Sequence, residues 1–175
     1  MTGPVFVDGQ AQPVFSTSSA TWIRQEGWAE STIDSDFDGK LDRIHFDVVR
    51  VMETETIGLK VPVVMEVSPY YAGGATIFNW GVDHEIGEPP TTKPPYIRTN
   101  FGNTSPIVSN ALNSTWVPRG FAVVHVEGTG SGYSEGCPTS GDRNETLGPK
   151  AVVDWLNGNA KAYTTVDGDE QIFAT

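Results

Sequence analysis

Residues 120–136, GFAVVHVEGTGSGYSEG, contribute most to the prediction of the fold. Their first part, FAVVHV at 121–126, is an apolar run bounded by Gly120 and Gly128. A second apolar run, VPVVMEV at 61–67, ends at Ser68. Short runs of this kind are typical of strands that are buried on both faces in the centre of a parallel sheet. We therefore predict two central parallel strands whose carboxyl ends deliver their loops to the same region.

The segments around these two runs complete a pattern of strands followed by a helix. Residues 22–32 alternate loosely between aromatic and charged side chains, and residues 43–51 (RIHFDVVRV) are rich in β-branched and aromatic residues, as strands are. Residues 148–157 (GPKAVVDWLN) place apolar side chains at helical spacing, with Gly158 as a C-cap. This order predicts the fold class α/β, a mixed sheet with antiparallel first strands, then parallel strands with a helix.

The chain is expected to divide into three kinds of segment. Residues 1–20 are polar and contain two prolines, which predicts an extended N-terminal arm. Residues 21–175 are expected to form part of one domain. Within it, residues 72–117 are rich in Gly, Pro and Asn and predict a long inserted loop region.

The composition excludes several classes of partner. The chain has 175 residues and a formal net charge of −11, from 22 acidic and 11 basic residues. An acidic protein without a basic patch is repelled by nucleic acid and by anionic membranes, so neither is expected as a partner. No apolar run approaches the length that spans a bilayer. Scarce lysine and abundant Asn, Thr and Ser favour a secreted, extracellular protein, and the single Cys137 allows no internal disulfide.

The segment DSDFDGKLD, residues 34–42, has the spacing of a calcium-binding loop. Gly39 allows the sharp turn that such a loop needs. The expected ligands are oxygens of Asp34, Asp36, Asp38, Lys40 (through its carbonyl) and Asp42. His45 stands where an EF-hand would have its bidentate Glu, and a strand is predicted to follow, so this is not an EF-hand pair. We expect a structural calcium ion here; an acidic β-turn without an ion is the alternative.

The glycine-rich segment after residue 126 matches two catalytic or binding patterns imperfectly. It lacks both the G-x-G-x-x-G pattern and a Gly-Lys-Ser/Thr sequence, so no nucleotide site is expected. Residues 132–136 match G-x-S-x-G, but a nucleophile elbow needs its Ser between a strand end and an immediate helix. Ser134 has neither neighbour in the predicted pattern. A glycine-rich turn that forms the rim of a site is the better interpretation, with Gly130, Ser131 and Tyr133 as its members.

Four segments in order resemble the X-prolyl dipeptidyl aminopeptidases and their cocaine-esterase-like relatives, which are α/β-hydrolases. They are DSDFDGKLDRI at 34–44, PVVMEVSPYY at 62–71, the stretch 120–136 and AVVDWLN at 151–157. The resemblance implies a serine exopeptidase that releases Xaa-Pro dipeptides from peptide N-termini by acyl-enzyme hydrolysis, without a cofactor for catalysis. A peptide would be the substrate.

The same resemblance assigns roles to individual residues. Tyr70 occupies the place of the family's oxyanion-hole tyrosine, and Tyr71 is expected on the substrate rim beside it. The Ser, Asp and His of the triad are expected beyond Thr175, so the chain would stop before the nucleophile elbow and depend on the remainder of the polypeptide. His45, His84 and His125 are therefore not expected to be the base, and His125 is expected to be a core residue.

Two other functions remain open from the sequence. One is an esterase or acyl transferase of the same fold, because this part of the fold does not determine the leaving group. The other is a non-enzymatic, calcium-stabilised binding module, which the acidic loop and five Trp residues would suit. The 175-residue chain alone is expected to be inactive and poorly stable, because a missing strand would leave an open apolar edge beside residues 121–126.

Overall fold

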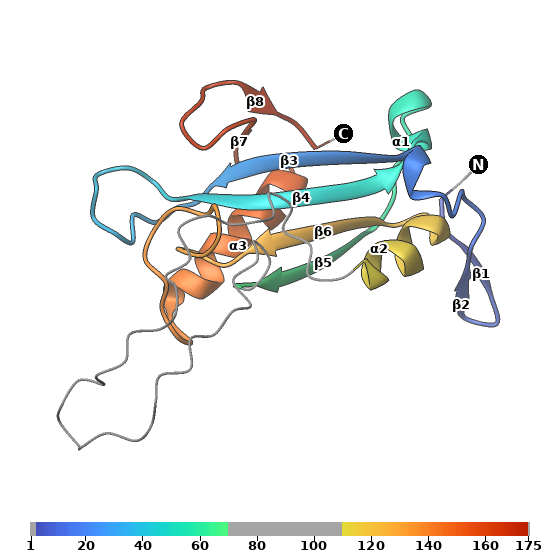
Figure 1. Ribbon diagram of the computed structural model, residues 1–175, viewed down its shortest axis with the longest axis horizontal. Coiled ribbons are helices and arrows are strands. Elements are labelled where there is room, and N and C mark those ends of the chain that lie inside the picture. The colour runs from blue at the N-terminus through green and yellow to red at the C-terminus, as the bar shows by residue number, and fades with distance from the viewer. Residues whose placement is uncertain (1–2, 70–109, 175) are drawn as a thin grey trace, which may run out of the picture.

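The structure, a computed structural model, describes residues 3–69 and 110–174 (Figure 1). The described elements form a small hairpin, a six-stranded sheet and a few helices. In chain order they are β1 (Val5–Val7), β2 (Gln10–Gln12), the 3-10 turn η1 (Ser19–Thr21), β3 (Trp22–Glu30), β4 (Arg43–Val51), α1 (Glu53–Thr56), β5 (Val63–Ser68), α2 (Ala111–Trp116), the 3-10 turn η2 (Val117–Arg119), β6 (Ala122–Glu127), α3 (Arg143–Leu156), β7 (Ala162–Tyr163) and β8 (Gln171–Ile172).

The main sheet is mixed, as the sequence predicts, and is compatible with an α/β fold. Its strand order is β5-β6-β4-β3-β7-β8. Strands β5 and β6 are parallel and in register from Val63 opposite Ala122 to Ser68 opposite Glu127, whereas the other neighbours are antiparallel. The predicted parallel pair is therefore confirmed, and the loops after Ser68 and Glu127 leave the sheet at the same edge (Figure 1).

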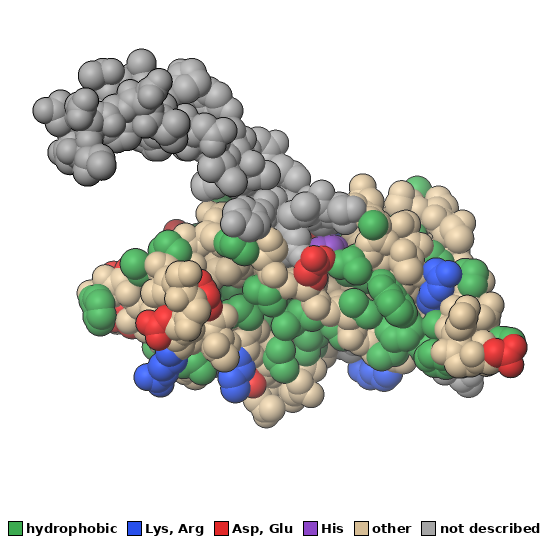
Figure 2. All heavy atoms as spheres, turned by 90° about the horizontal axis from the view of Figure 1, so that it is seen from below, with side chains coloured by type: hydrophobic (Ala, Val, Ile, Leu, Met, Phe, Trp, Pro, Cys, Tyr) green, Lys and Arg blue, Asp and Glu red, His purple; other side chains and the backbone are tan. Residues whose placement is uncertain are grey.

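The burial of the two parallel strands differs from the prediction. All six residues of β6 are buried, but β5 is half-exposed, with Val63 39% and Val67 41% exposed. Within the described residues β5 is the edge strand, while β6 lies between β5 and β4. The expectation that 61–67 is buried on both faces was wrong, and so was the expectation of an open edge beside 121–126. Figure 2, seen from the side of β5, shows hydrophobic side chains gathered across the middle of that surface.

The strand alternation divides the core between the two faces of the sheet. Even-numbered residues of β4 and β6 pack with α3 in one cluster, whose buried members include Phe46, Val124 and Trp155. Odd-numbered residues of the same strands face the opposite way, and Val49 and Val123 pack there with Phe15 in a second cluster. The odd positions nearer the carboxyl end of β6 are polar, and these side chains build the candidate site.

Three predicted segments differ in detail from the structure. The predicted N-terminal arm contains the β1–β2 hairpin, and η1 begins at Ser19 within it. Helix α3 begins at Arg143 rather than near 148, because Asp142 caps its N-terminus by accepting a hydrogen bond from the Arg143 N–H, at 2.6 Å. Helix α2 lies inside the region 72–117 that was predicted as loop, while residues 70–109 lie outside the described part. Among the described helices, none is both long and apolar enough to cross a bilayer.

Candidate functional site

The candidate site lies at the edge of the sheet where β5 and β6 end. The acidic loop between β3 and β4 reaches the same end, because β4 runs antiparallel to β6 (Figure 1). The loops that follow these two strands begin close together, since a Cβ added to Gly128 would lie 3.7 Å from the Cβ of Pro69. Tyr70 and Tyr71 follow directly in the sequence but lie outside the described residues, so their predicted roles stay predictions.

The glycine-rich segment 128–136 folds into consecutive tight turns. The Ser131 N–H donates to the Gly128 carbonyl at 3.0 Å, and the Ser134 N–H donates to the Ser131 carbonyl at 2.9 Å. Gly130 and Gly132 have φ angles of +67° and +59°, in the left-handed region that glycine adopts at little cost. The segment then returns to the sheet, where the Glu135 N–H donates to the Arg43 carbonyl at 2.9 Å. The predicted glycine-rich turn thus lies at the carboxyl end of β6.

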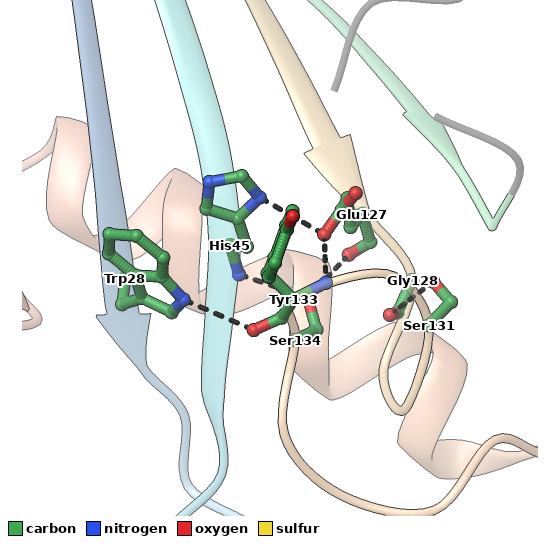
Figure 3. Close-up of polar contacts among 7 residues, drawn as sticks. All are labelled: Trp28, His45, Glu127, Gly128, Ser131, Tyr133 and Ser134. Carbon is green, nitrogen blue, oxygen red and sulfur yellow. Dashed lines mark hydrogen bonds and ion pairs between the residues drawn. The ribbon is translucent and has the colours of Figure 1, made fainter. Parts of the chain in front are cut away.

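Ser134 is bound into this framework (Figure 3). Its hydroxyl oxygen accepts a hydrogen bond from the His45 N–H at 2.9 Å and donates to the Glu127 carbonyl at 3.4 Å. It lies seven residues beyond the end of β6, and α3 begins only at Arg143. This geometry lacks the strand–nucleophile–helix arrangement of an elbow, in agreement with the interpretation from sequence.

A buried carboxylate and a buried imidazole lie beneath the glycine-rich segment. The Glu127 Oε2 atom lies 3.0 Å from His45 Nδ1 and accepts the Tyr133 N–H at 2.6 Å (Figure 3). Glu127 and His45 are each 1% exposed. The Trp28 indole lies 4.6 Å from the His45 ring between centroids, and its N–H donates to the Tyr133 carbonyl at 3.1 Å. The Tyr133 ring meets the His45 ring edge-on at 5.5 Å.

Sequence reasoning did not find this pair. It placed His45 on a strand and rejected it as the catalytic base, and it assigned Glu127 no role. A usable signal was present, because Glu127 is a charged residue that directly continues a buried strand, and such a residue is rarely buried unless it is paired.

A second buried polar pair lies one row further into the same face of the sheet. Asp47 on β4 is directly opposite His125 on β6, and both are almost fully buried. Burial raises the pKa of the Asp47 carboxyl to about 6, against a weaker lowering effect of Arg24. Burial also lowers the pKa of His125. The low-dielectric surroundings therefore favour the uncharged form of both side chains, and the core position expected for His125 is confirmed.

The acidic loop brings part of the predicted calcium ligands together. Oxygens of Asp34, Asp36 and Asp42 lie within 4.8 Å of one another. Asp42 is buried, its carboxylate accepts the Ser35 hydroxyl at 2.5 Å, and burial raises its pKa. Asp38 is exposed and is not a member of this group; its carboxylate accepts the Lys40 N–H at 2.8 Å. The convergence of three carboxylates suits a hard cation, and calcium binding stays a prediction.

The chain is similar to one family over most of its length. The family described as X-Pro dipeptidyl-peptidase (S15 family) matches residues 38–166. A curated protein of Rhodopirellula baltica is 43% identical over 175 residues, which cover 98% of this chain and 28% of that protein. Xaa-Pro dipeptidyl-peptidases of Lactiplantibacillus plantarum and Ligilactobacillus salivarius are 37% and 34% identical, each over 98% of this chain and 24% of their own length. The chain thus spans about a quarter of the length of these relatives.

Proposed function

The chain belongs to the X-Pro dipeptidyl-peptidase (S15) family of α/β-hydrolases, and from this membership we propose that it is part of a serine exopeptidase. The proposed reaction releases Xaa-Pro dipeptides from peptide N-termini through an acyl-enzyme. In this proposal the described residues build one side of the reaction centre, and the remainder of the polypeptide supplies the Ser, His and Asp of the triad.

The parallel register of β5 and β6 is the observation that carries the proposal. Ser68 lies opposite Glu127, so the segment that begins Pro69-Tyr70-Tyr71 starts beside the glycine-rich segment. In open α/β sheets, ligands bind outside the carboxyl ends of the strands, where loops from neighbouring strands converge. A tyrosine and a glycine-rich rim that start from adjacent strand ends are suited to act on one substrate carbonyl.

We assign the oxyanion donor to Tyr70 and the substrate rim to Tyr71, Gly130, Ser131 and Tyr133. A phenol O–H that is held at a strand end can donate to the oxygen of a tetrahedral intermediate as negative charge develops there. The loss of one such donor typically lowers kcat by about 10²–10³. We assign Ser134 no comparable catalytic role, because its hydroxyl already bonds to the backbone of His45 and Glu127.

The test is hydrolysis of Ala-Pro-anilide by the protein expressed from its complete coding sequence. We expect Tyr70→Phe to lower kcat by about 10²–10³, whereas the matched change Tyr71→Phe alters it by less than about tenfold. Ser134→Ala should keep turnover. Loss of all turnover in Ser134→Ala, with a normal thermal unfolding midpoint, would show that the nucleophile had been assigned wrongly. Turnover of an acyl ester, dependent on Tyr70, without any turnover of the anilide would favour an esterase or acyl transferase.

We also propose that the acidic loop 34–42 holds a structural calcium ion and that the protein acts outside the cell. The three converging carboxylates support the ion, and they repel one another unless a cation lies between them. Composition supports the location, which fractionation of the native organism into cells and medium would test. A calcium-dependent module that binds a ligand but turns over neither anilide nor ester would favour the non-enzymatic alternative.

A further inference from the structure

We infer that the buried Glu127–His45 pair is a positioning device that holds the glycine-rich segment 128–136 in the conformation that receives substrate. The kinetic part of this inference rests on the proposed function, whereas its structural part does not. Neither side chain is proposed to touch the reacting atoms, so both are positioning residues.

Two groups meet at one carboxylate oxygen of Glu127. Glu127 Oε2 accepts the Tyr133 N–H at 2.6 Å and lies 3.0 Å from His45 Nδ1. An ionised carboxylate only accepts hydrogen bonds, so His45 Nδ1 must carry the proton in that state. Hydrogen bonds to a buried ionised carboxylate are stronger than neutral ones, and losing one removes part of the compensation for its burial. In that state, movement of Tyr133 away from Glu127 therefore carries a free-energy cost, even though His45 stays beside Oε2.

Further hydrogen bonds hold the backbone around this anchor, the Glu127–His45 pair. The Trp28 indole N–H holds the Tyr133 carbonyl, and Ser134 bridges the His45 N–H and the Glu127 carbonyl. Two consecutive residues of the glycine-rich segment are thus held by strands β3, β4 and β6. The segment is therefore held by groups of the sheet in addition to the backbone hydrogen bonds of its own turns.

The backbone at Gly132 passes close to the Glu127 carboxylate. A Cβ added to Gly132 would lie 2.1 Å from Glu127 Oε1, and Gly132 has a φ of +59°. Within the described residues, Oε1 has no hydrogen-bond partner, so the hold on the segment passes through Oε2. Glycine at position 132 and glutamate at position 127 are therefore required together, one to let the backbone approach and the other to bind it.

The location of the anchor connects it with substrate binding. Glu127 is the last residue of β6 and lies opposite Ser68, two residues before Tyr70. The residues proposed to form the rim, Gly130, Ser131 and Tyr133, follow Glu127 within one tight segment. Loosening this segment would misplace the rim relative to the oxyanion donor, and small displacements of positioning groups weaken productive binding.

The experiment compares Glu127→Gln with Glu26→Gln, which makes the same chemical change at an exposed position on β3. We expect Glu127→Gln to raise KM for Ala-Pro-anilide by about tenfold to a hundredfold with a smaller change in kcat, as the loss of a charge-assisted hydrogen bond predicts. Amide hydrogen exchange of a peptide covering 128–136 should become faster, while exchange elsewhere in the sheet stays as in the unsubstituted protein. Glu26→Gln should change neither quantity.

Substitution of His45, the partner of Glu127, provides an independent experiment. An asparagine amide can place its N–H where His45 Nδ1 stands, whereas leucine fills the space without a donor. Amide hydrogen exchange of 128–136 should therefore be slower, and KM lower, in His45→Asn than in His45→Leu. This arm also keeps the inference testable if Glu127→Gln does not fold.

The outcomes separate this inference from the proposed function. If the unsubstituted protein does not hydrolyse Ala-Pro-anilide, the proposed function fails, and the exchange measurements still decide whether the anchor exists. Unchanged exchange of 128–136 and unchanged KM in both Glu127→Gln and His45→Leu would overturn the anchor. A fall in kcat alone, with normal KM and normal exchange, would also overturn it, because that result indicates only a smaller amount of active protein.

Discussion

Among the described residues, Asp47 is a buried carboxyl whose ionisation opposes folding. It is 2% exposed, and burial raises the pKa of its carboxyl from 3.8 to about 6. Because the folded protein binds this proton more tightly than the unfolded chain, stability from this group is present at low pH and is lost as the pH rises to about 6. With about 1.4 kcal/mol per pKa unit, ionised Asp47 costs roughly 3 kcal/mol above that pH.

We therefore predict that Asp47→Asn raises the thermal unfolding midpoint at about pH 7.5 and that its advantage vanishes near pH 4. The amide keeps the shape of the carboxyl but removes the charge. Thermal unfolding across this pH range measures the effect, and Asp169→Asn, a change at an exposed carboxylate, should leave the midpoint unaltered. A lower midpoint for Asp47→Asn at about pH 7.5 would show that the ionised group is favourably paired in the folded protein.

At the scale of elements, the acidic loop joins β3 to β4 and lies against the end of the glycine-rich segment and against Cys137, the residue after it. The Cys137 N–H donates to the Ser35 hydroxyl at 2.8 Å, and that hydroxyl donates to Asp42 at 2.5 Å. A Cβ on Gly136 would lie 2.4 Å from Asp42 Oδ2. An ion bound by this loop would thus stabilise both the acidic loop and the glycine-rich segment, at the carboxyl end of β6.

We predict that calcium raises the thermal unfolding midpoint and that Asp34→Asn abolishes this shift. At a concentration one hundred times the dissociation constant, a ligand bound only by the folded state adds about 2.7 kcal/mol. Calorimetry with and without calcium, after removal of metal by a chelator, measures the shift. Asp38→Asn is the control and should leave the calcium-dependent shift in place, because Asp38 stands outside the group formed by Asp34, Asp36 and Asp42. An equal midpoint with and without calcium would exclude the ion.

At the scale of the whole molecule, the described sheet is unevenly covered. Helix α3 covers one face of the sheet. Strand β5, at an edge of the described sheet, is less covered and carries two half-exposed valines. A groove of about 500 Å³ runs beside it and is lined in part by Val63, Met65 and Leu156. Exposed apolar edge strands pair with other chains, which leads to aggregation.

We predict that the 175-residue chain expressed alone forms large aggregates and that Val67→Lys shifts it towards monomer. A lysine on an edge strand opposes pairing through its charge and its long polar end. Size-exclusion chromatography with light scattering reads the result. Val7→Lys, on the exposed β1 strand, is the matched control and should have little effect. A monomeric unsubstituted chain with one cooperative unfolding transition would contradict the prediction.

The local sequence determined the strands and their kinds. The run RIHFDVVRV at 43–51 predicted β4 with the bounds that the structure has, and the run at 121–126 predicted a strand buried at every position. Both succeed because β-branched and other apolar side chains fit the pleated, packed surface of a sheet, whichever strands become the neighbours. The family resemblance, carried by four short segments, was likewise readable from the sequence and is confirmed.

Tertiary structure alone decided which side chains meet. His45 and Glu127 are 82 residues apart, and only the pairing of β4 with β6 places them on the same face in the same row. The same pairing left β5, not β6, at the edge of the described sheet, and the folding of the acidic loop left Asp38 outside the carboxylate group. Sequence patterns report the periodicity of a single segment, whereas the register between segments depends on long-range contacts that form only when the whole sheet assembles.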